Sequence, residues 1–565
     1  MKNMKTICRY EILRLAGLGA AVLSFPLAGK AYPPAFQSLE KSSPERPNIV
    51  VILADDMGYS DIGCCGSEIH TPNLDALSKS GILFPQFYNA ARCCPSRASV
   101  LTGLYPHQAG IGGMAGDYLA RNDVIPAYQG HLGRNCVTLG EAMALNGYYT
   151  VFSGKWHVGD EREEMLPHKR GFTRSFFTPG GAGNYYRLGW ADGVPEPYKL
   201  DGADHLPGPD FYDTDAVFNF ARQFIEGRPA DRPFFAFLTP KAPHWPLQAK
   251  AADIAKYKGV YDGGWDELRE QRYKKQIETG LISKDWKLAP RSDSDGAVPA
   301  WNTLSKEQQH KMAAKMEVYA AQVDCLDQNV GKLIDFLKKN NLFDNTLILF
   351  LSDNGACAEP EEQPLGGDWK DGKGGPVGAQ DSFESYGRCW AEVSNTPFRL
   401  WKQKVHEGGI STPLIASWPA GISVPGTVNR QPGHLMDIMA TCLDVSGGTY
   451  PAEYNGQKIQ PLEGISFAPV FRGSERKEHE EIAWEHFANR GIRCGRWKLV
   501  SQTYDNWIHA KPGLWELYDM KTDRTEMSNL AAVMPEKTKQ LAAQYDKWAR
   551  RTGVIDNAAD WREKK

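Results

Sequence analysis

The residues best suited to chemistry follow directly after apolar runs that are typical of buried strands. Four such runs end in charged or amide side chains: NIVVIL is followed by Asp55 and Asp56, TVFSG by Lys155 and His157, FFAFLTP by Lys241 and His244, and TLILFLS by Asp353 and Asn354. Because ligands bind beyond the carboxyl ends of the strands in an open α/β sheet, we expect these side chains to meet at one edge. One carboxylate after a strand is as well explained by helix capping or a turn, but four such ends are harder to explain that way.

The acidic part of this set predicts a site for a hard cation. Asp55, Asp56, Asp353 and Asn354 offer only oxygen ligands, which suit Ca²⁺ or Mg²⁺ and not zinc. Carboxylates placed this close together need a compensating charge, since otherwise their pKa values rise. The lysines and histidines suit an anionic substrate, because lysine holds negative charge and histidine moves protons.

The stretch RCCPSR at 92–97, followed by ASVLTG, predicts a short helix that starts at an anion site. Pro95 fits the first turn of a helix and Gly103 fits just beyond its end, so the helix should cover about 95–102. Cys93 and Cys94 then lie at its N-terminus, where free N–H groups and the helix dipole favour an anion. Arg97 adds a bidentate clamp for a tetrahedral oxyanion. Taken alone, the same stretch also fits two buried cysteines that precede a helix.

Strand and helix patterns alternate along most of the chain, which predicts an α/β fold with a mainly parallel sheet flanked by helices. The strand-like runs are continuous and do not alternate with polar residues, as expected of a sheet covered on both faces. They cover 48–56, 148–157, 233–244, 345–355 and 411–419. Helical patterns cover 71–81, 137–148 and 312–341, the last with a long apolar stripe.

Two regions interrupt this alternation, and a third follows it. Residues 160–231 and about 246–310 are polar and rich in Gly, Pro, Tyr and Trp, so we expect long inserted loops with short helices that shape a pocket. After about 470 the pattern changes to short antiparallel strands and a closing helix at 535–553. We therefore expect a catalytic domain over 45–470 and a smaller C-terminal α+β subdomain with an antiparallel sheet over 471–565.

Composition and charge limit the class of protein. The 565 residues are 42% hydrophobic and 11% aromatic, with a formal net charge of −3, which indicates a folded protein without a basic stripe for nucleic acid. Residues 1–31 combine early basic residues with a short apolar run and a small-residue cleavage site, so we expect a bacterial signal peptide. That predicts an exported, periplasmic or secreted protein without stable membrane insertion; the alternative is an ordinary N-terminal helix. The eleven cysteines include no CxxC pair, and their pairing cannot be read from the sequence.

The segment CCPSRASVLTG at 93–103 resembles the signature of the sulfatase family, with Cys93 at the required distance from Pro95 and Arg97. NIVVILADDMGYSDIGCCG, TPNLDALSKSG, GKWHVG, APHWP, LSDNGA and FRLWKQKVHEGGISTPLIASWP match further family motifs in the same order, over about 48–420. The chain is most similar to the bacterial arylsulfatase-like branch of the formylglycine-dependent sulfatases. This resemblance implies an alkaline phosphatase-like large domain and a sulfuric ester hydrolase of the arylsulfatase type.

The resemblance also implies the chemistry of the site. Cys93 would be oxidised to formylglycine (3-oxoalanine) by a formylglycine-generating maturation enzyme, and its hydrated gem-diol would attack sulfur. Ca²⁺, in preference to Mg²⁺, would be bound by Asp55, Asp56, Asp353, Asn354 and the modified Cys93. Arg97 would stabilise the gem-diol, and Lys155 and His157 would contact the sulfate. His244 and Lys402 would contact the leaving-group oxygen. Lys402 is preferred over Lys404 because it lies five residues before the Glu of EGG, and the role of His406 stays open.

The substrate implied is a sulfated small molecule or, more naturally, a sulfated glycan. Two alternatives stay open: a formylglycine-dependent phosphonate or phosphodiester hydrolase of the same superfamily, and a catalytically inactive carbohydrate-binding relative. Aromatic residues in the inserted regions either stack on sugar or aryl rings or pack in the core. They include Tyr185, Trp190, Trp265 and Trp301.

Overall fold

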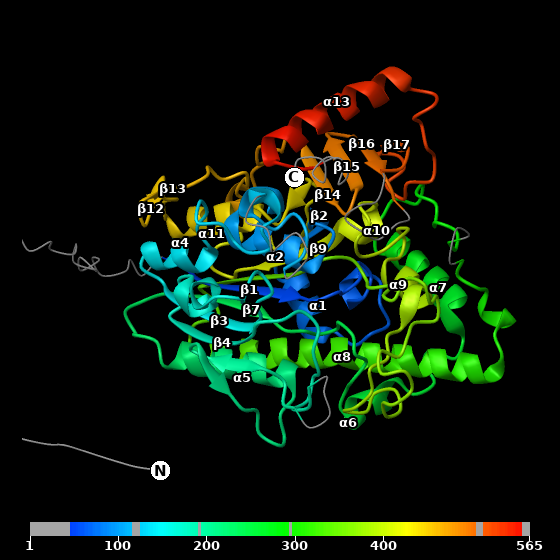
Figure 1. The fold of residues 1–565 in the computed structure, drawn as a ribbon, viewed down its shortest axis with the longest axis horizontal. Coiled ribbons are helices and arrows are strands. Elements are labelled where there is room, and N and C mark those ends of the chain that lie inside the picture. Colours follow the sequence, from blue (N-terminus) through cyan, green and yellow to red (C-terminus); the bar gives the residue numbers. More distant parts are fainter. Residues whose placement is uncertain (1–45, 116–124, 190–193, 293–296, 504–511, 556–565) are drawn as a thin grey trace, which may run out of the picture. The chain divides into compact units, whose positions relative to one another are not determined.

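A mixed sheet of eleven strands forms the centre of the computed structural model, which describes residues 46–115, 125–189, 194–292, 297–503 and 512–555 (Figure 1). The strand order is β10-β2-β9-β8-β1-β7-β3-β4-β5-β6, with β11 paired to β2. The strands β8, β1, β7, β3 and β4 are all parallel to one another. Their bounds are Thr346–Ser352 for β8, Asn48–Ala54 for β1, Phe234–Thr239 for β7, Tyr149–Lys155 for β3 and Arg174–Thr178 for β4.

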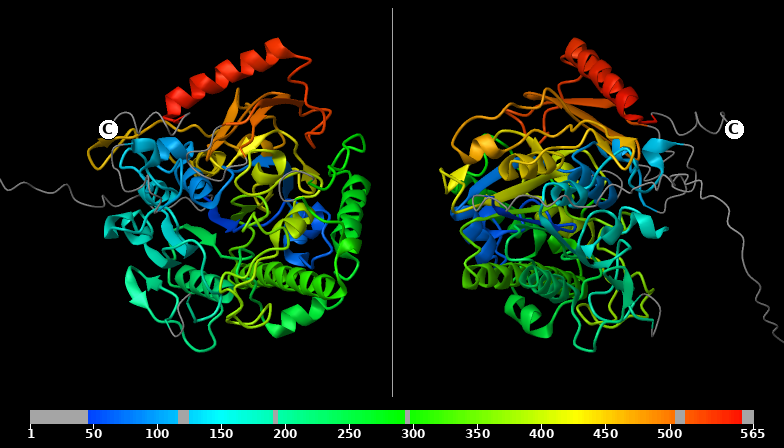
Figure 2. Two further views of the ribbon diagram at one scale, coloured as in Figure 1. Left: turned by 45° about the vertical axis from the view of Figure 1, so that its right-hand side comes forward. Right: turned by 90° about the vertical axis from the view of Figure 1, so that its left-hand side faces the viewer.

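Both faces of this sheet are buried, which explains why its strands read as unbroken apolar runs. In β1, Ile49, Val51 and Leu53 pack on one side against α2 (Cys93–Thr102), α4 (Leu139–Leu145) and α11 (Asp437–Ser446). Val50 and Ile52 pack on the other side against α1 (Pro72–Lys79), α5 (Asp213–Glu226) and α8 (Lys306–Lys339). The green helix α8 and the teal helix α5 stay on one side of the sheet in every view (Figure 2). The result is a three-layer α/β arrangement.

The expected fold class is confirmed. All five predicted strands and all three predicted helices are present, the fifth strand being β9 (Ser411–Ser417). The short helix predicted from RCCPSR is α2; it begins at Cys93 itself and ends before Gly103, which adopts φ 70°. Helix α8 begins at Lys306, six residues before the predicted start, where Ser305 and Gln308 form a capping box.

Four details of the structure differ from the sequence expectations or add to them. β9 pairs antiparallel with both β8 and β2 (Ile82–Tyr88), because a continuously apolar strand fixes burial but not direction. The strand β2 itself was not predicted. The region 160–231 is no simple loop, since it supplies β4, the short strands β5 (Tyr198–Leu200) and β6 (Ala203–His205), and the 14-residue helix α5. The region 246–310 likewise contains the 15-residue helix α7 (Gly264–Glu278) beside α6 (Ala251–Ile254).

The C-terminal part forms a four-stranded antiparallel sheet covered by one helix, as expected. The strands are β14 (Ile482–His486), β15 (Asn489–Cys494), β16 (Trp497–Ser501) and β17 (Trp515–Asp519), and the helix is α13 (Pro535–Thr552), red in Figure 1. Buried ion pairs join this part to the main domain: Glu407 Oε1 lies 2.7 Å from Lys498 Nζ of β16, and Glu407 Oε2 lies 2.8 Å from Arg524 Nε. Glu407 precedes β9, so these contacts fix the antiparallel sheet beside the edge of the large one.

The remaining expectations concern the signal peptide, Trp190, the cysteines and membrane insertion. The predicted signal peptide and Trp190 lie outside the described residues. All ten described cysteines are free thiols. No helix within the described ranges is both long and apolar enough to cross a lipid bilayer.

Candidate active site

The ends of β1 and β8 bring four oxygen-bearing side chains together. Ala54 and Ser352 are paired in the parallel register, so Asp55 and Asp353 leave the sheet at the same level. The Asp56 amide donates to Asp353 Oδ1 at 3.1 Å, and Asn354 Nδ2 donates to Asp56 Oδ1 at 2.7 Å. All four side chains are buried.

This oxygen cluster fits a cation. Among the residues that the structure describes, Asp55 Oδ1 and Asn354 Oδ1 are buried without a hydrogen-bond partner. Asp55, Asp56 and His244 also each offer a ligand atom within 4.8 Å of the others. Buried oxygen atoms are normally satisfied, and unpartnered ones gathered in an acidic cluster suit a hard cation. The chain therefore carries acidic residues able to bind a metal.

Two buried cations close the other side of the cluster. Lys155 Nζ lies 2.6 Å from Asp55 Oδ2, and Arg97 Nη2 lies 3.0 Å from Asp353 Oδ2 and 3.6 Å from Asp55 Oδ2. Burial alone would raise the pKa of Asp55, but Lys155, His244 and Arg97 hold it at about 2. Burial and the neighbouring Asp55 charge raise the pKa of Asp353 well above its ordinary value. Asp353 is therefore the carboxylate of this cluster whose negative charge the neighbouring basic groups stabilise least.

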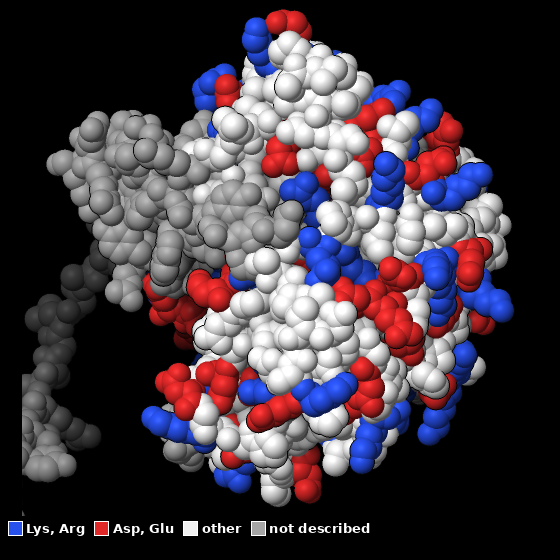
Figure 3. Space-filling model, turned by 90° about the vertical axis from the view of Figure 1, so that its right-hand side faces the viewer, with Lys and Arg blue, Asp and Glu red and all other residues white. Residues whose placement is uncertain are grey.

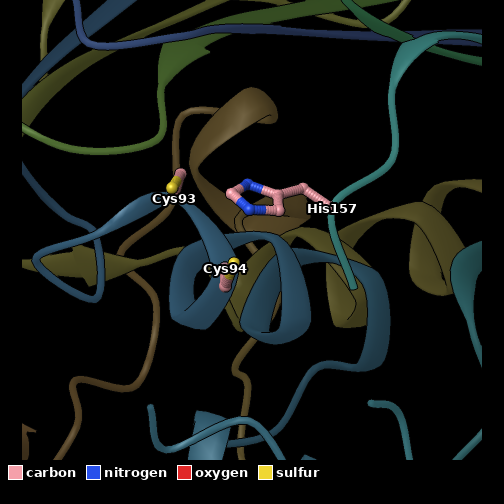
Figure 4. A group of neighbouring side chains, drawn as sticks. All are labelled: Cys93, Cys94 and His157. Atoms are coloured by element: carbon pink, nitrogen blue, oxygen red, sulfur yellow. The ribbon is translucent and has the colours of Figure 1, made fainter. Parts of the chain in front are cut away.

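The two adjacent cysteines have different surroundings. Cys93 is the first residue of α2, and His157 reaches toward it from the segment after β3 (Figure 4). A hydrogen bond from Cys94, together with Lys155 and His157, lowers the pKa of the Cys93 thiol well below its ordinary value despite burial. Cys94 packs in the core, accepts a hydrogen bond from the Ala115 amide at 3.4 Å, and has its pKa raised well above the ordinary value by burial. The two thiols thus differ: the surroundings of Cys93 favour its thiolate form, whereas those of Cys94 disfavour it.

A third group of side chains faces Asp56 from the opposite direction. His244 follows β7, and its Nε2 lies 3.2 Å from Asp56 Oδ2. Lys402 Nζ lies 3.0 Å from the same oxygen and 3.4 Å from His244 Nε2. Burial would lower the pKa of Lys402, but Asp56 and Glu359 raise it well above the ordinary value, so this lysine is charged. The structure thus brings the residues to which the resemblance assigns a role into one largely buried cluster, with Cys93 and His157 at one end and His244 and Lys402 at the other.

Two other residues near the predicted motifs lie elsewhere. Lys241, which follows β7 like His244, is turned away and lies 3.2 Å from Glu196 and 3.7 Å from Asp213. His406 lies 3.4 Å from Glu516 of β17 and belongs to the contact between the two sheets.

Stacking on a ligand and packing in the core were both open for the four named aromatic residues of the inserted regions, and the three that the structure describes pack in the core. Tyr185, Trp265 and Trp301 are buried, at 0%, 1% and 8% exposure, and so present no ring face to a ligand. The aromatic residues beside the site are Trp245 and Trp369 instead. Their rings stack at 4.6 Å, Trp245 lies 4.9 Å from the ring of His244, and Trp369 is 42% exposed. Trp245 stands in the APHWP motif, whereas nothing in the local sequence distinguishes Trp369.

Comparisons with known proteins match the chain to one family along most of its length. The family model "Sulfatase" matches residues 47–448, and the model "N-sulphoglucosamine sulphohydrolase, C-terminal" matches 399–550. An uncharacterised sulfatase of Schizosaccharomyces pombe is 34% identical over 92% of this chain and 97% of its own length. The arylsulfatase of Klebsiella aerogenes is 34% identical over 82% of this chain and 98% of its own. A crystal structure of Ps i-CgsB in complex with k-i-k-neocarrahexaose has a TM-score of 0.64 and 26% identity, covering 91% of this chain and 94% of that one.

Proposed function

The chain belongs to the sulfatase family and is a sulfuric ester hydrolase; from this premise we propose that it removes sulfate from sulfated glycans, with Cys93 as the position of the nucleophile. One observation carries the assignment of the site: the acidified Cys93 thiol at the N-terminus of α2 lies beside Lys155 and His157, at the edge of an oxygen cluster with unpartnered atoms. This combination suits a tetrahedral anion held between a nucleophile and a cation.

We propose Ca²⁺ as the metal. Asp55, Asp56, Asp353 and Asn354 would hold it, and the residue at position 93 would complete the set. An oxygen-only ligand set with several carboxylates suits Ca²⁺ better than Mg²⁺, which prefers to retain water. When bound, the ion would offset negative charge that develops on the sulfate oxygens.

Conversion of Cys93 to formylglycine by a maturation enzyme, followed by addition of water to the aldehyde, would supply a hydroxyl nucleophile and a second hydroxyl on the same carbon. The residues of this chain then have defined tasks. Arg97 and Lys155 offset charge beside position 93, and His157 takes a proton from the hydroxyl there. On the far side of the sulfate, His244 gives a proton to the departing alcohol oxygen, and Lys402 offsets its charge as the S–O bond breaks.

The glycan assignment rests on the surroundings of the site. The structural relative in complex with an oligosaccharide supports a saccharide substrate. The stacked Trp245 and Trp369 pair leads from His244 to solvent and offers an exposed ring on which a sugar can pack. Basic and acidic side chains are interspersed on the face in Figure 3 and the net charge is −3, so attraction for a sulfated ligand must come from the local cations of the site.

The proposal extends to the export and the domain division of the chain. We propose that residues 1–31 act as an export signal that directs the protein to the periplasm or beyond. We also propose that 45–470 form the catalytic domain and 471–565 the C-terminal subdomain. The comparisons are with sulfatases, and no observation favours a phosphonate hydrolase or an inactive relative.

The first test is the mass of the peptide that contains Cys93, from protein produced together with a formylglycine-generating enzyme. We expect an aldehyde at position 93 and an intact thiol at Cys94. Activity should then appear on sulfate monoesters and exceed that on phosphonates and phosphodiesters. Full sulfatase activity with a thiol at position 93 would overturn the assignment of the nucleophile.

A further inference from the structure

The carboxylate of Glu359 lies at the junction of the segments that carry the site. Its Oε1 accepts from Arg92 Nη2 at 2.9 Å and from Gln403 Nε2 at 3.0 Å. Arg92 immediately precedes Cys93, and Gln403 immediately follows Lys402. The backbone makes the same link, since the Gln403 amide donates to the Ala91 carbonyl at 2.8 Å. Glu359 thus ties the segment of the nucleophile to the segment of Lys402.

The second oxygen of the same carboxylate reaches the leaving-group side. Glu359 Oε2 accepts from the indole Nε1 of Trp245 at 3.2 Å and lies 3.5 Å from Lys402 Nζ. Trp245 directly follows His244. One side chain therefore touches Lys402 itself and the neighbours of Cys93, His244 and Lys402. These contacts occupy its acceptor positions, so Glu359 is placed to hold protein groups and not a substrate hydroxyl.

The charges near Lys402 show why such a residue is needed. Lys402 Nζ lies between two carboxylates, Asp56 at 3.0 Å and Glu359 at 3.5 Å. Asp56 belongs to the oxygen cluster that would bind the cation, and a bound cation would offset part of its negative charge. Glu359 would then be the principal counter-charge of a lysine that is 2% exposed.

We propose that Glu359 is a positioning residue that holds Lys402, and through Trp245 also His244, at the leaving-group oxygen. This inference rests on the proposed roles of His244 and Lys402. It predicts that loss of Glu359 impairs the departure of the alcohol more than the binding of sulfate.

The test is steady-state kinetics of the matured enzyme and of Glu359→Gln on a series of aryl sulfates, from nitrophenyl sulfates to phenyl sulfate. A good leaving group needs little help from an acid, whereas a poor one depends on it. We expect kcat to fall about tenfold or more for phenyl sulfate and less than about threefold for the nitrophenyl esters, with KM little changed. The plot of log kcat against the pKa of the parent phenol should therefore become steeper.

Matched variants separate this role from a loss of folding. Glu68→Gln removes a carboxylate that is similarly enclosed, paired with Arg272 at 2.9 Å on α7, and should leave the slope unchanged. Trp245→Phe keeps an aromatic, though smaller, ring and removes the indole N–H donor, so it should steepen the slope to a smaller extent even if Glu359→Gln folds poorly.

His244→Ala distinguishes a failure of the inference about Glu359 from a failure of the proposed leaving-group role of His244. If His244→Ala steepens the slope and neither Glu359→Gln nor Trp245→Phe does, the inference about Glu359 is wrong while the proposed function stands. If His244→Ala does not steepen it either, the leaving-group assignment fails and takes the inference with it. A Glu359→Gln loss that is equal across the whole series would mean a structural role only.

Discussion

We expect Arg97→Ala to lower the thermal stability of the protein by an amount that can be worked out from the contacts of Arg97. The guanidinium is 1% exposed, pairs with Asp353 and Asp55, and donates to the Lys155 carbonyl at 2.8 Å. Its removal leaves the buried carboxylate of Asp353 without the cation that it pairs with, whereas Asp55 keeps Lys155; breaking such a buried pair typically costs about 3–5 kcal/mol. The entropy of unfolding is about 2 cal/mol/K per residue, so a cooperative unit of this size would lose about 4 °C in Tm.

The same argument predicts how calcium changes this loss. Without Arg97 the oxygen cluster is more negative, so the variant should bind Ca²⁺ more tightly than the wild type, by about tenfold. Tenfold in affinity corresponds to about 1.4 kcal/mol of additional stabilisation when the ion is saturating. The difference in Tm between wild type and variant should therefore be largest in chelator and shrink when Ca²⁺ is added, although activity is lost in both conditions.

Thermal unfolding with EDTA and with excess Ca²⁺ measures this effect, and Arg97→Lys is the matched control. Lysine keeps the charge but not the fork that reaches Asp353, Asp55 and the Lys155 carbonyl together. We expect it to lie between wild type and Arg97→Ala in chelator. A difference in Tm that stays the same with and without Ca²⁺ would show that the ion does not bind at these carboxylates, and the argument for the metal site would be wrong.

Three further predictions are independent of that one. Cys93→Ala should reduce sulfatase activity to background, whereas Cys94→Ala should keep it and lower stability by about 1 kcal/mol, as measured by urea unfolding. Trp369→Ala should raise KM for a sulfated oligosaccharide about 3- to 10-fold, whereas Trp369→Phe should not. Equal KM values for the two variants would refute the proposal that a sugar packs on the ring of Trp369. Burial would raise the pKa of Asp437, but His479 and Arg476 hold it at about 2. At pH values above its ordinary pKa of 3.8 this carboxylate therefore adds about 2 kcal/mol to the free energy of unfolding, and this contribution is lost as the pH falls toward 2. His479→Ala should reduce the stability difference between pH 7 and pH 3, and an unchanged difference would contradict the assignment.

The sequence predicts the site better than it predicts the path of the chain around it. Asp55 and Asp353 could be placed together because both follow buried parallel strands, and the register of β1 and β8 brings such residues level. Lys241 follows the same strand as His244 but lies elsewhere, because its pairing with Glu196 depends on the region 160–231, for which the sequence predicts only inserted loops with short helices. Glu359 had no signal, since it lies beyond any strand end and acts only through contacts with distant segments.

The backbone at the site explains why those contacts must be rigid. Asp56, Ala91, His157 and Gln403 all have positive φ, at 65°, 65°, 56° and 78°, although none is glycine. Each such residue costs about 1–3 kcal/mol unless the surrounding structure fixes it, so strain of this kind persists only where packing and hydrogen bonds are dense. Here two of the four are joined directly, because the Gln403 amide donates to the Ala91 carbonyl, and the Glu359 carboxylate holds the Gln403 side chain. The sheet edge fixes where these segments begin, and the hydrogen bonds between them hold their strained turns in place, which is why we expect Glu359 to matter as much for the geometry of the proposed site as the residues proposed to contact the sulfate.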